Sequence, residues 1–155
     1  MKIDIGIADK ERKSVAEGLK QLLADSYALY VKTHNYHWNV TGPLFKSVHD
    51  LTEEQYLALA TAIDEIAERI RMLGVKAPAG FKLYSDMSKI GDGDENASAE
   101  DMLKDLVKGH EAVIRTARSI RPSAEKAGDE GTVALIDDRM AFHEKQAWML
   151  RSLAA

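Results

Sequence analysis

Residues 33–50, which read THNYHWNVTGPLFKSVHD, separate two long stretches with helical spacing. Gly42 and Pro43 interrupt the pattern, and both residue types break helices. His37 and His49 lie on either side of this break at similar distances from it. The flanking stretches are therefore predicted to form an antiparallel helical hairpin in which the two imidazoles sit at nearly the same level and can face one another.

Helical periodicity extends from this turn in both directions, in steps of three and four residues that predict one buried stripe per helix. The stripe before the turn contains Leu19, Leu23, Ser26, Tyr30, Thr33 and His37. The second helix is predicted over residues 44–73 and ends at Gly74, a residue type that favours helix C-termini. Its stripe contains Phe45, Val48, Thr52, Leu59, Ile66, Ile70 and Leu73.

Residues 75–97 show little periodicity and predict a long connection with one short helix at 84–89. Ser98 resembles a helix cap for a third helix, which Pro122 should kink or end. A fourth helix follows Gly128. The stripes of these helices contain Leu103, Leu106, His110, Val113, Ala117 and Ile120, then Val133, Ile136, Met140, His143, Ala147 and Leu150. Two hairpins joined by a crossover predict an all-α four-helix bundle, here a single domain over 1–155 with a short N-terminal arm at 1–9.

The composition, with 45% hydrophobic and 30% charged residues, is that of an ordinary globular protein. Since the sequence has no apolar run of membrane length and no signal-peptide core, we expect a cytoplasmic protein without a membrane partner. The chain has no cysteine, so a metal site must use histidine nitrogen and carboxylate oxygen, which suits iron, manganese or zinc. The net charge of −4 disfavours nucleic acid as a partner.

Asp64 and Glu68 are four residues apart, so both carboxylates project from one face of the second helix. Together with His37 and His49 they form a reasonable ligand set for a redox-active metal. However, the span from His49 to Asp64 corresponds to about 22 Å of helix, too far for one ion. Either the two pairs are unrelated or a second subunit completes the site. The sequence has no Glu-x-x-His, which argues against a di-iron site inside the bundle.

The run from Thr33 to Gly74, together with GTVALIDDRMAFHEKQAWMLR at 131–151, resembles the Dps family, miniferritins named as DNA-binding proteins from starved cells. The similarity extends from about Lys10 to Leu153. It implies a ferritin-like four-helix subunit with a short helix in the central connection, assembled as a hollow homododecamer. It also implies a ferroxidase that oxidises ferrous iron, preferably with hydrogen peroxide, stores ferric mineral and protects the cell from oxidative damage.

The resemblance further implies that the iron ligands and catalytic residues are His37 and His49 of one subunit with Asp64 and Glu68 of its mate, giving two sites per dimer. Zinc or manganese could occupy the same site. The residues expected near the ligands are His34, Trp38 and Glu53. We expect a hydrogen-bonded supporting role for His34 and a packing role for Trp38. Should three subunits meet at the start of the fourth helix, a cation pore could be lined by Asp129, Glu130, Asp137 and Asp138.

Two other functions stay open at this point: a DNA-coating nucleoid protein with a secondary metal site, and a zinc-binding bundle without oxidase activity. DNA binding is doubtful because the N-terminal arm mixes basic with acidic residues. His110 and His143 fall in the apolar stripes of the last two helices. We expect them to meet as hydrogen-bonded core residues rather than as metal ligands.

Overall fold

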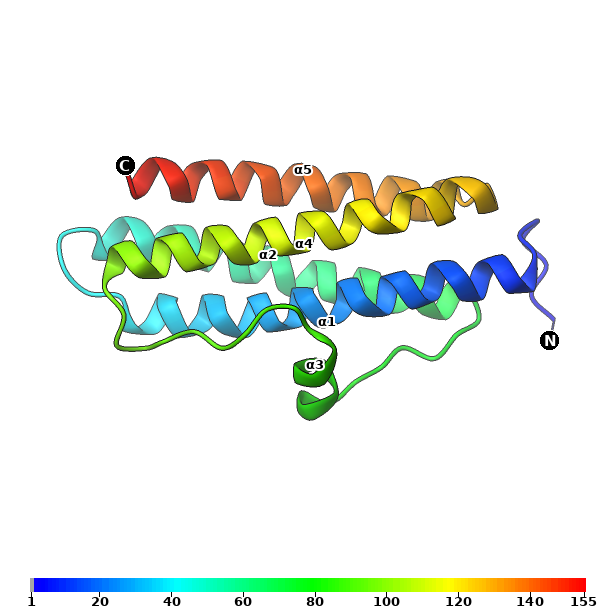
Figure 1. Ribbon diagram of the computed structural model, residues 1–155, viewed down its shortest axis with the longest axis horizontal. Helices are drawn as coiled ribbons and strands as arrows, with labels where there is room; N and C mark the ends of the chain where they lie inside the picture. The colour runs from blue at the N-terminus through cyan, green and yellow to red at the C-terminus, as the bar shows by residue number, and fades with distance from the viewer. Residues whose placement is uncertain (1) are drawn as a thin grey trace.

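The computed structural model describes residues 2–155, and this part of the chain forms five helices and no strand (Figure 1). Among these residues no helix combines the length and apolarity needed to cross a bilayer. The elements are α1 (Asp9–Asn39), α2 (Phe45–Met72), α3 (Phe81–Met87), α4 (Ala99–Ala127) and α5 (Glu130–Leu153).

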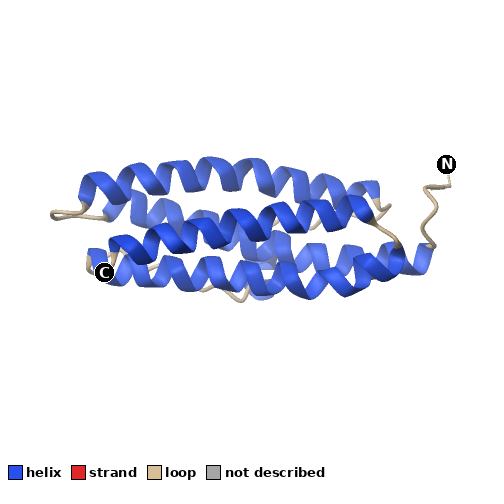
Figure 2. Ribbon diagram, turned by 90° about the horizontal axis from the view of Figure 1, so that it is seen from above, coloured by secondary structure: helices blue, strands red, loops and turns tan. Residues whose placement is uncertain are grey.

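The four long helices form a bundle of two antiparallel hairpins, α1–α2 and α4–α5. The connection that carries α3 runs along the outside of α1 from one end of the bundle to the other, so that α4 starts beside the α1–α2 turn (Figure 1). Both views place the described N-terminal arm and the C-terminus at opposite ends of the bundle (Figure 2). The all-α four-helix architecture with a short helix in a long crossover is confirmed.

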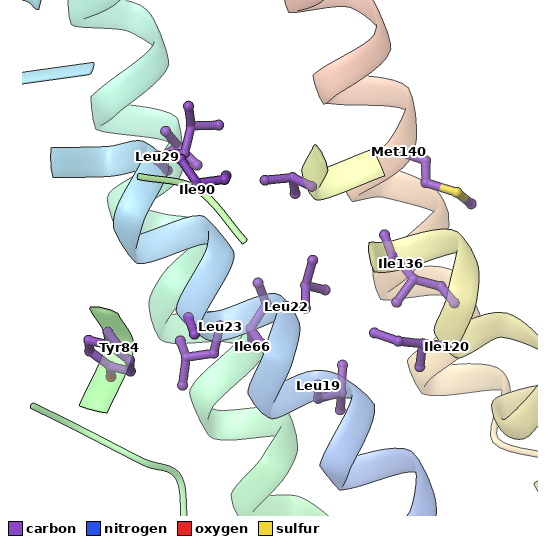
Figure 3. Close-up of a cluster of buried hydrophobic side chains, with 14 of the residues drawn as sticks. Leu19, Leu22, Leu23, Leu29, Ile66, Tyr84, Ile90, Ile120, Ile136 and Met140 are labelled. Carbon is purple, nitrogen blue, oxygen red and sulfur yellow. The ribbon is translucent and has the colours of Figure 1, made fainter. Parts of the chain in front are cut away.

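The core is built from the stripes that the periodicity predicts. Figure 3 shows leucines of α1 packed against isoleucines of α2, α4 and α5. The members of the α4 and α5 stripes are all buried, and the residues of the α1 stripe are buried or half-buried. Each fully buried large apolar side chain stabilises the fold by roughly 1.5–3 kcal/mol, so the bundle rests mainly on this seam.

The helix ends follow from local chemistry. The Ser98 hydroxyl accepts a hydrogen bond from the Asp101 amide at the start of α4, which confirms the predicted cap. Gly128 ends α4 with a φ of 64°, a left-handed conformation that favours glycine. Gly74, with a φ of 86°, follows the end of α2 in the same way.

Three sequence predictions need correction. Phe45 is 42% exposed, because it lies at the first position of α2, before that helix packs against the bundle. The short helix begins at Phe81, and its Tyr84 is anchored by a hydrogen bond from its hydroxyl to the Pro78 carbonyl. Of the two outcomes predicted for Pro122, ending the helix is wrong: α4 continues to Ala127, and buried Ala124 keeps its last turns packed although proline removes one backbone hydrogen bond.

Asp25 fixes the crossover to the bundle. Its carboxylate is fully buried and accepts hydrogen bonds from the side chains of Gln21, Ser88 and Thr116 and from the Lys89 amide. These donors come from α1, the crossover and α4. One carboxylate thus joins three segments that are far apart in the sequence.

Candidate metal centre

His37, near the end of α1, and His49, in the second turn of α2, meet across the turn as predicted. Their rings stack with centroids 3.8 Å apart and an interplanar angle of 16°. The His37 Nδ1 lies 2.8 Å from the His49 carbonyl oxygen, and the His49 Nδ1 lies 2.9 Å from the His37 carbonyl oxygen. Each ring is therefore held by the backbone of the other histidine.

These two contacts determine which nitrogen of each neutral ring carries the proton. A carbonyl oxygen can only accept a hydrogen bond, so Nδ1 must carry the proton in each neutral imidazole. The lone pair then resides on Nε2, and this is the form in which histidine binds a metal ion with its other nitrogen anchored. The geometry therefore fits two prepared nitrogen ligands.

Thr52 supports this arrangement, and the sequence reasoning identified it only as a core position. Its Oγ1 lies 3.2 Å from the His37 Nδ1 and donates to the Val48 carbonyl at 2.7 Å. The only available signal was its place one turn after His49 on the same helix. Thr52 restricts the orientation of the His37 ring.

Asp64 and Glu68 are exposed on α2, one turn apart, as the spacing predicts. They lie on the same helix as His49 but roughly 22 Å further along it. Accordingly, residues 2–155 of one chain contain no cluster of three or more histidine or acidic residues able to hold a metal. One chain brings the imidazoles together and leaves the carboxylates apart from them.

The residues expected near the ligands form an aromatic group. The His34 ring stacks on Trp38 with centroids 5.0 Å apart and a 3° interplanar angle, and its hydrogen-bonded supporting role stays a prediction. Trp38 is 68% exposed in a single chain, and its packing against the site stays a prediction. Glu53 is exposed and accepts a hydrogen bond from the Tyr56 hydroxyl at 3.4 Å.

The four carboxylates expected at a pore differ in their surroundings. Asp129 is 1% exposed, because it caps α5 through the Thr132 amide and pairs with Arg69. Asp137 pairs with Arg121 on α4. Glu130 and Asp138 are exposed. The Asp129 carboxylate is thus occupied within its own chain, which removes it from the candidates for a pore lining.

His110 and His143 meet inside the bundle, which confirms the prediction of a hydrogen-bonded core pair. Their Nδ1 atoms are 2.8 Å apart and both side chains are fully buried. Burial lowers the pKa of His110 to about 3 and that of His143 well below its usual range. The pair is therefore neutral at neutral pH, with one ring donating to the other.

Comparisons with known proteins agree with this fold. A family model described as a ferritin-like domain matches residues 16–155. A DNA protection during starvation protein of Bacillus anthracis is 39% identical over 140 residues, which cover 90% of this chain and 96% of that protein. The crystal structure of the Dps protein from Vibrio cholerae O1 superposes with a TM-score of 0.93 at 32% identity, covering 100% of this chain and 98% of that one. This chain belongs to the Dps family of ferritin-like proteins.

A further relative by sequence is a low temperature-induced protein of Nostoc, 43% identical over 155 residues that cover 97% of this chain and 86% of that protein. The Vibrio cholerae Dps is described as a member of a superfamily of ferritin-like diiron-carboxylate proteins. In this Dps subunit the histidine pair and the carboxylate pair lie apart on the same chain.

Proposed function

We propose that this Dps chain is a ferroxidase and iron-storage protein. It oxidises ferrous iron, with hydrogen peroxide as the preferred oxidant, and stores the ferric product inside a hollow homododecamer in the cytoplasm. The observation that carries this proposal is the reciprocal hydrogen bonding of His37 and His49, because it occupies the Nδ1 of both stacked rings and leaves Nε2 as the metal-binding nitrogen of each. Family membership supports the same conclusion.

The complete site is proposed to lie between two chains related by a twofold axis. His37 and His49 of one chain would then meet Asp64 and Glu68 of its mate, and the symmetry would create two such sites per dimer. Support comes from large apolar side chains of α1, α2 and α3 that are exposed in a single chain, some of which a second copy would cover. They are Val31, Trp38, Leu57, Met72, Phe81 and Leu83.

The proposed chemistry follows from the ligand types. Carboxylate oxygens stabilise ferric iron more than ferrous iron, and so they lower the free energy of the oxidised product. Two bound ferrous ions each lose one electron. Peroxide takes both electrons and two protons, its O–O bond breaks, and two water molecules leave. Because both electrons arrive together, no hydroxyl radical is released.

The test compares the wild type with a His37→Ala, Asp64→Ala double variant, each shown to be assembled by light scattering. After anaerobic ferrous loading and peroxide addition, stopped-flow absorbance should show ferric formation at least about 100-fold slower in the double variant. Loss of a group that only supports a metal ligand already lowers affinity or activity by about 10- to 100-fold, and loss of two ligands should cost at least as much. Wild-type rates in the variant would overturn the ligand assignment. Zinc or manganese can bind the same donors, and we expect zinc to act as a competitor.

We also propose that DNA association is weak. Asp9 pairs with Arg12 and Lys13, at 3.0 and 2.7 Å, and Arg12 also donates to the carbonyls of Ile7 and Leu73. Much of the positive charge near the N-terminus is thus occupied within the chain. Tight duplex binding in a gel-shift assay at about 0.15 M salt would instead favour a DNA-coating role.

Any cation pore at the start of α5 is proposed to be lined by Glu130 and Asp138, whose carboxylates are exposed. Asp137 is a weaker candidate because Arg121 offsets its charge. A Glu130→Gln, Asp138→Asn variant should take up ferrous iron more slowly. It should oxidise ferrous iron that is already inside the cage at the normal rate. Unchanged uptake would remove these residues from the pore.

A further inference from the structure

A series of aromatic rings leads from the candidate metal centre, through Tyr56 of α2 and two tyrosines of α1, to α3. The Tyr56 ring lies edge-on to the His37 ring with centroids 5.1 Å apart, and Tyr30 lies 6.4 Å beyond Tyr56. Tyr27 follows at 6.0 Å and stacks on Tyr84 of α3 at 4.7 Å. All these spacings lie within the range of direct aromatic contact. The series ends at a cleft of about 410 Å³ between α1 and the crossover, which Tyr27 and Tyr84 help to line.

Tyr56, the ring next to the metal ligand, has a proton acceptor at hand. Its hydroxyl donates to the exposed Glu53 carboxylate at 3.4 Å. Desolvation, followed by the charge of Glu53, raises the pKa of Tyr56, so the phenol keeps its proton at neutral pH. A tyrosine in this setting can lose an electron to an oxidant at the adjacent metal centre and a proton to Glu53 in one step.

His34 joins this series to Trp38. Its ring centroid lies 4.4 Å from that of Tyr30, 4.3 Å from that of Tyr56 and 5.0 Å from that of Trp38. Burial, followed by the neighbouring His37, lowers the pKa of His34. A neutral imidazole therefore fills the space between the two tyrosines and the tryptophan.

Electron counting shows where such a series is needed. Peroxide requires two electrons, but a single ferrous ion supplies one. A centre that holds one ion would therefore release hydroxyl radical. The chain has no cysteine, so the readily oxidised side chains near the site are those of tyrosine and tryptophan.

We propose that Tyr56 supplies the second electron when a centre holds a single ferrous ion, and that Glu53 accepts the phenolic proton. This inference rests on the proposed ferroxidase function. Iron goes from ferrous to ferric and Tyr56 from phenol to phenoxyl radical. The peroxide O–O bond breaks and both oxygens leave as water, using the phenolic proton, which Glu53 passes on and so regains its charge, and one proton from solvent.

The radical is then shared with Tyr30, Tyr27 and Tyr84, and through His34 with Trp38. The next ferrous ion to bind gives one electron to the phenoxyl, which takes one proton from solvent and becomes a phenol again. The two steps together oxidise two ferrous ions per peroxide. The aromatic series thus keeps the overall reaction unchanged when iron is scarce.

A first experiment uses the assembled, metal-free protein and so does not depend on ferroxidase activity. In a Trp148→Phe background, Trp38 is the only tryptophan. Flash photolysis at the red edge of tryptophan absorption should produce a Trp38 radical whose decay matches the growth of tyrosyl absorption. This growth should be lost in a Tyr30→Phe, Tyr56→Phe variant and retained in Tyr36→Phe, the same change outside the series. Equal growth in all variants would overturn the proposal.

A second experiment adds limiting ferrous iron and then peroxide, with freeze-quench electron paramagnetic resonance. The wild type should show a phenoxyl signal that Tyr56→Phe lacks, and Tyr56→Phe should yield more spin-trapped hydroxyl radical. Glu53→Gln keeps the Tyr56 ring but removes the carboxylate that accepts its proton, so it should slow phenoxyl formation. Ferric product without any phenoxyl in the wild type would reject the Tyr56 role and leave the ferroxidase intact. Absence of ferric product at full loading would instead reject the proposed function.

Discussion

The His37 and His49 side chains each bind the other's backbone: the two Nδ1–carbonyl distances are 2.8 and 2.9 Å. This reciprocal arrangement sets the tautomer of both rings and directs their Nε2 lone pairs away from the backbone. It requires α1 and α2 to meet at the same level, so the Gly42–Pro43 turn is part of the site. The histidine half of the proposed metal centre is therefore formed by the fold of one chain.

Thr52→Val removes the hydroxyl beside the His37 Nδ1 and keeps the shape of the side chain. We expect affinity for a divalent probe such as cobalt to fall about tenfold, as for other groups that orient a metal-binding histidine. Isothermal titration of the assembled protein measures this change. Thr61→Val, an exposed position on the same helix, is the control. Equal affinities in the two variants would show that Thr52 does not orient the ligand.

Asp25→Asn replaces a fully buried carboxylate that accepts four hydrogen bonds. An amide presents one oxygen and brings two donors towards groups that are themselves donors. We expect the free energy of unfolding to fall by about 3 kcal/mol. Urea unfolding measures it, with exposed Asp86→Asn as a control that should change stability by less than about 0.5 kcal/mol. Similar values for both variants would contradict the anchoring role.

The His110–His143 pair predicts a pH dependence of stability. The pKa of His110 is about 3 in the folded chain, and the ordinary histidine value is 6.5. Between these values the unfolded chain binds more protons, so stability falls as pH falls from about 6.5 towards 3, with a slope of up to about 1.4 kcal/mol per pH unit for each buried histidine. Above about pH 6.5 the pair adds no pH dependence.

A His110→Leu, His143→Leu variant tests this, because two apolar residues can replace a buried polar pair. Its stability should decline less steeply than that of the wild type when urea unfolding is followed from pH 7 down to pH 4.5. Parallel curves for the two proteins would show that other groups control acid sensitivity.

The sequence predicted the bundle well where one periodic signal dominates. The α4 and α5 stripes are buried throughout, and Ser98 caps α4. The His37–His49 pairing followed from equal distances to one turn. The separation of Asp64 from His49 followed from helix rise alone.

Features that depend on contacts between helices were not predictable in the same way. The spacing gave no sign that Asp129 would be neutralised by Arg69, which is 60 residues away in sequence. Nor does any single helix reveal that Tyr56 lies between His37 and Tyr30, since this depends on how α1 and α2 are rotated about their axes. The aromatic group around His34 has the same origin.

The central claim is that each metal centre takes its histidines from one chain and its carboxylates from another. It is tested by mixing a His49→Ala chain with a Glu68→Ala chain in one cage, with mixing verified by native mass spectrometry. Half of randomly formed dimers are mixed, and each has one intact site of two, so ferrous oxidation should recover to about one quarter of the wild-type rate. Each variant alone should remain inactive. No recovery in proven mixed cages would contradict the shared site.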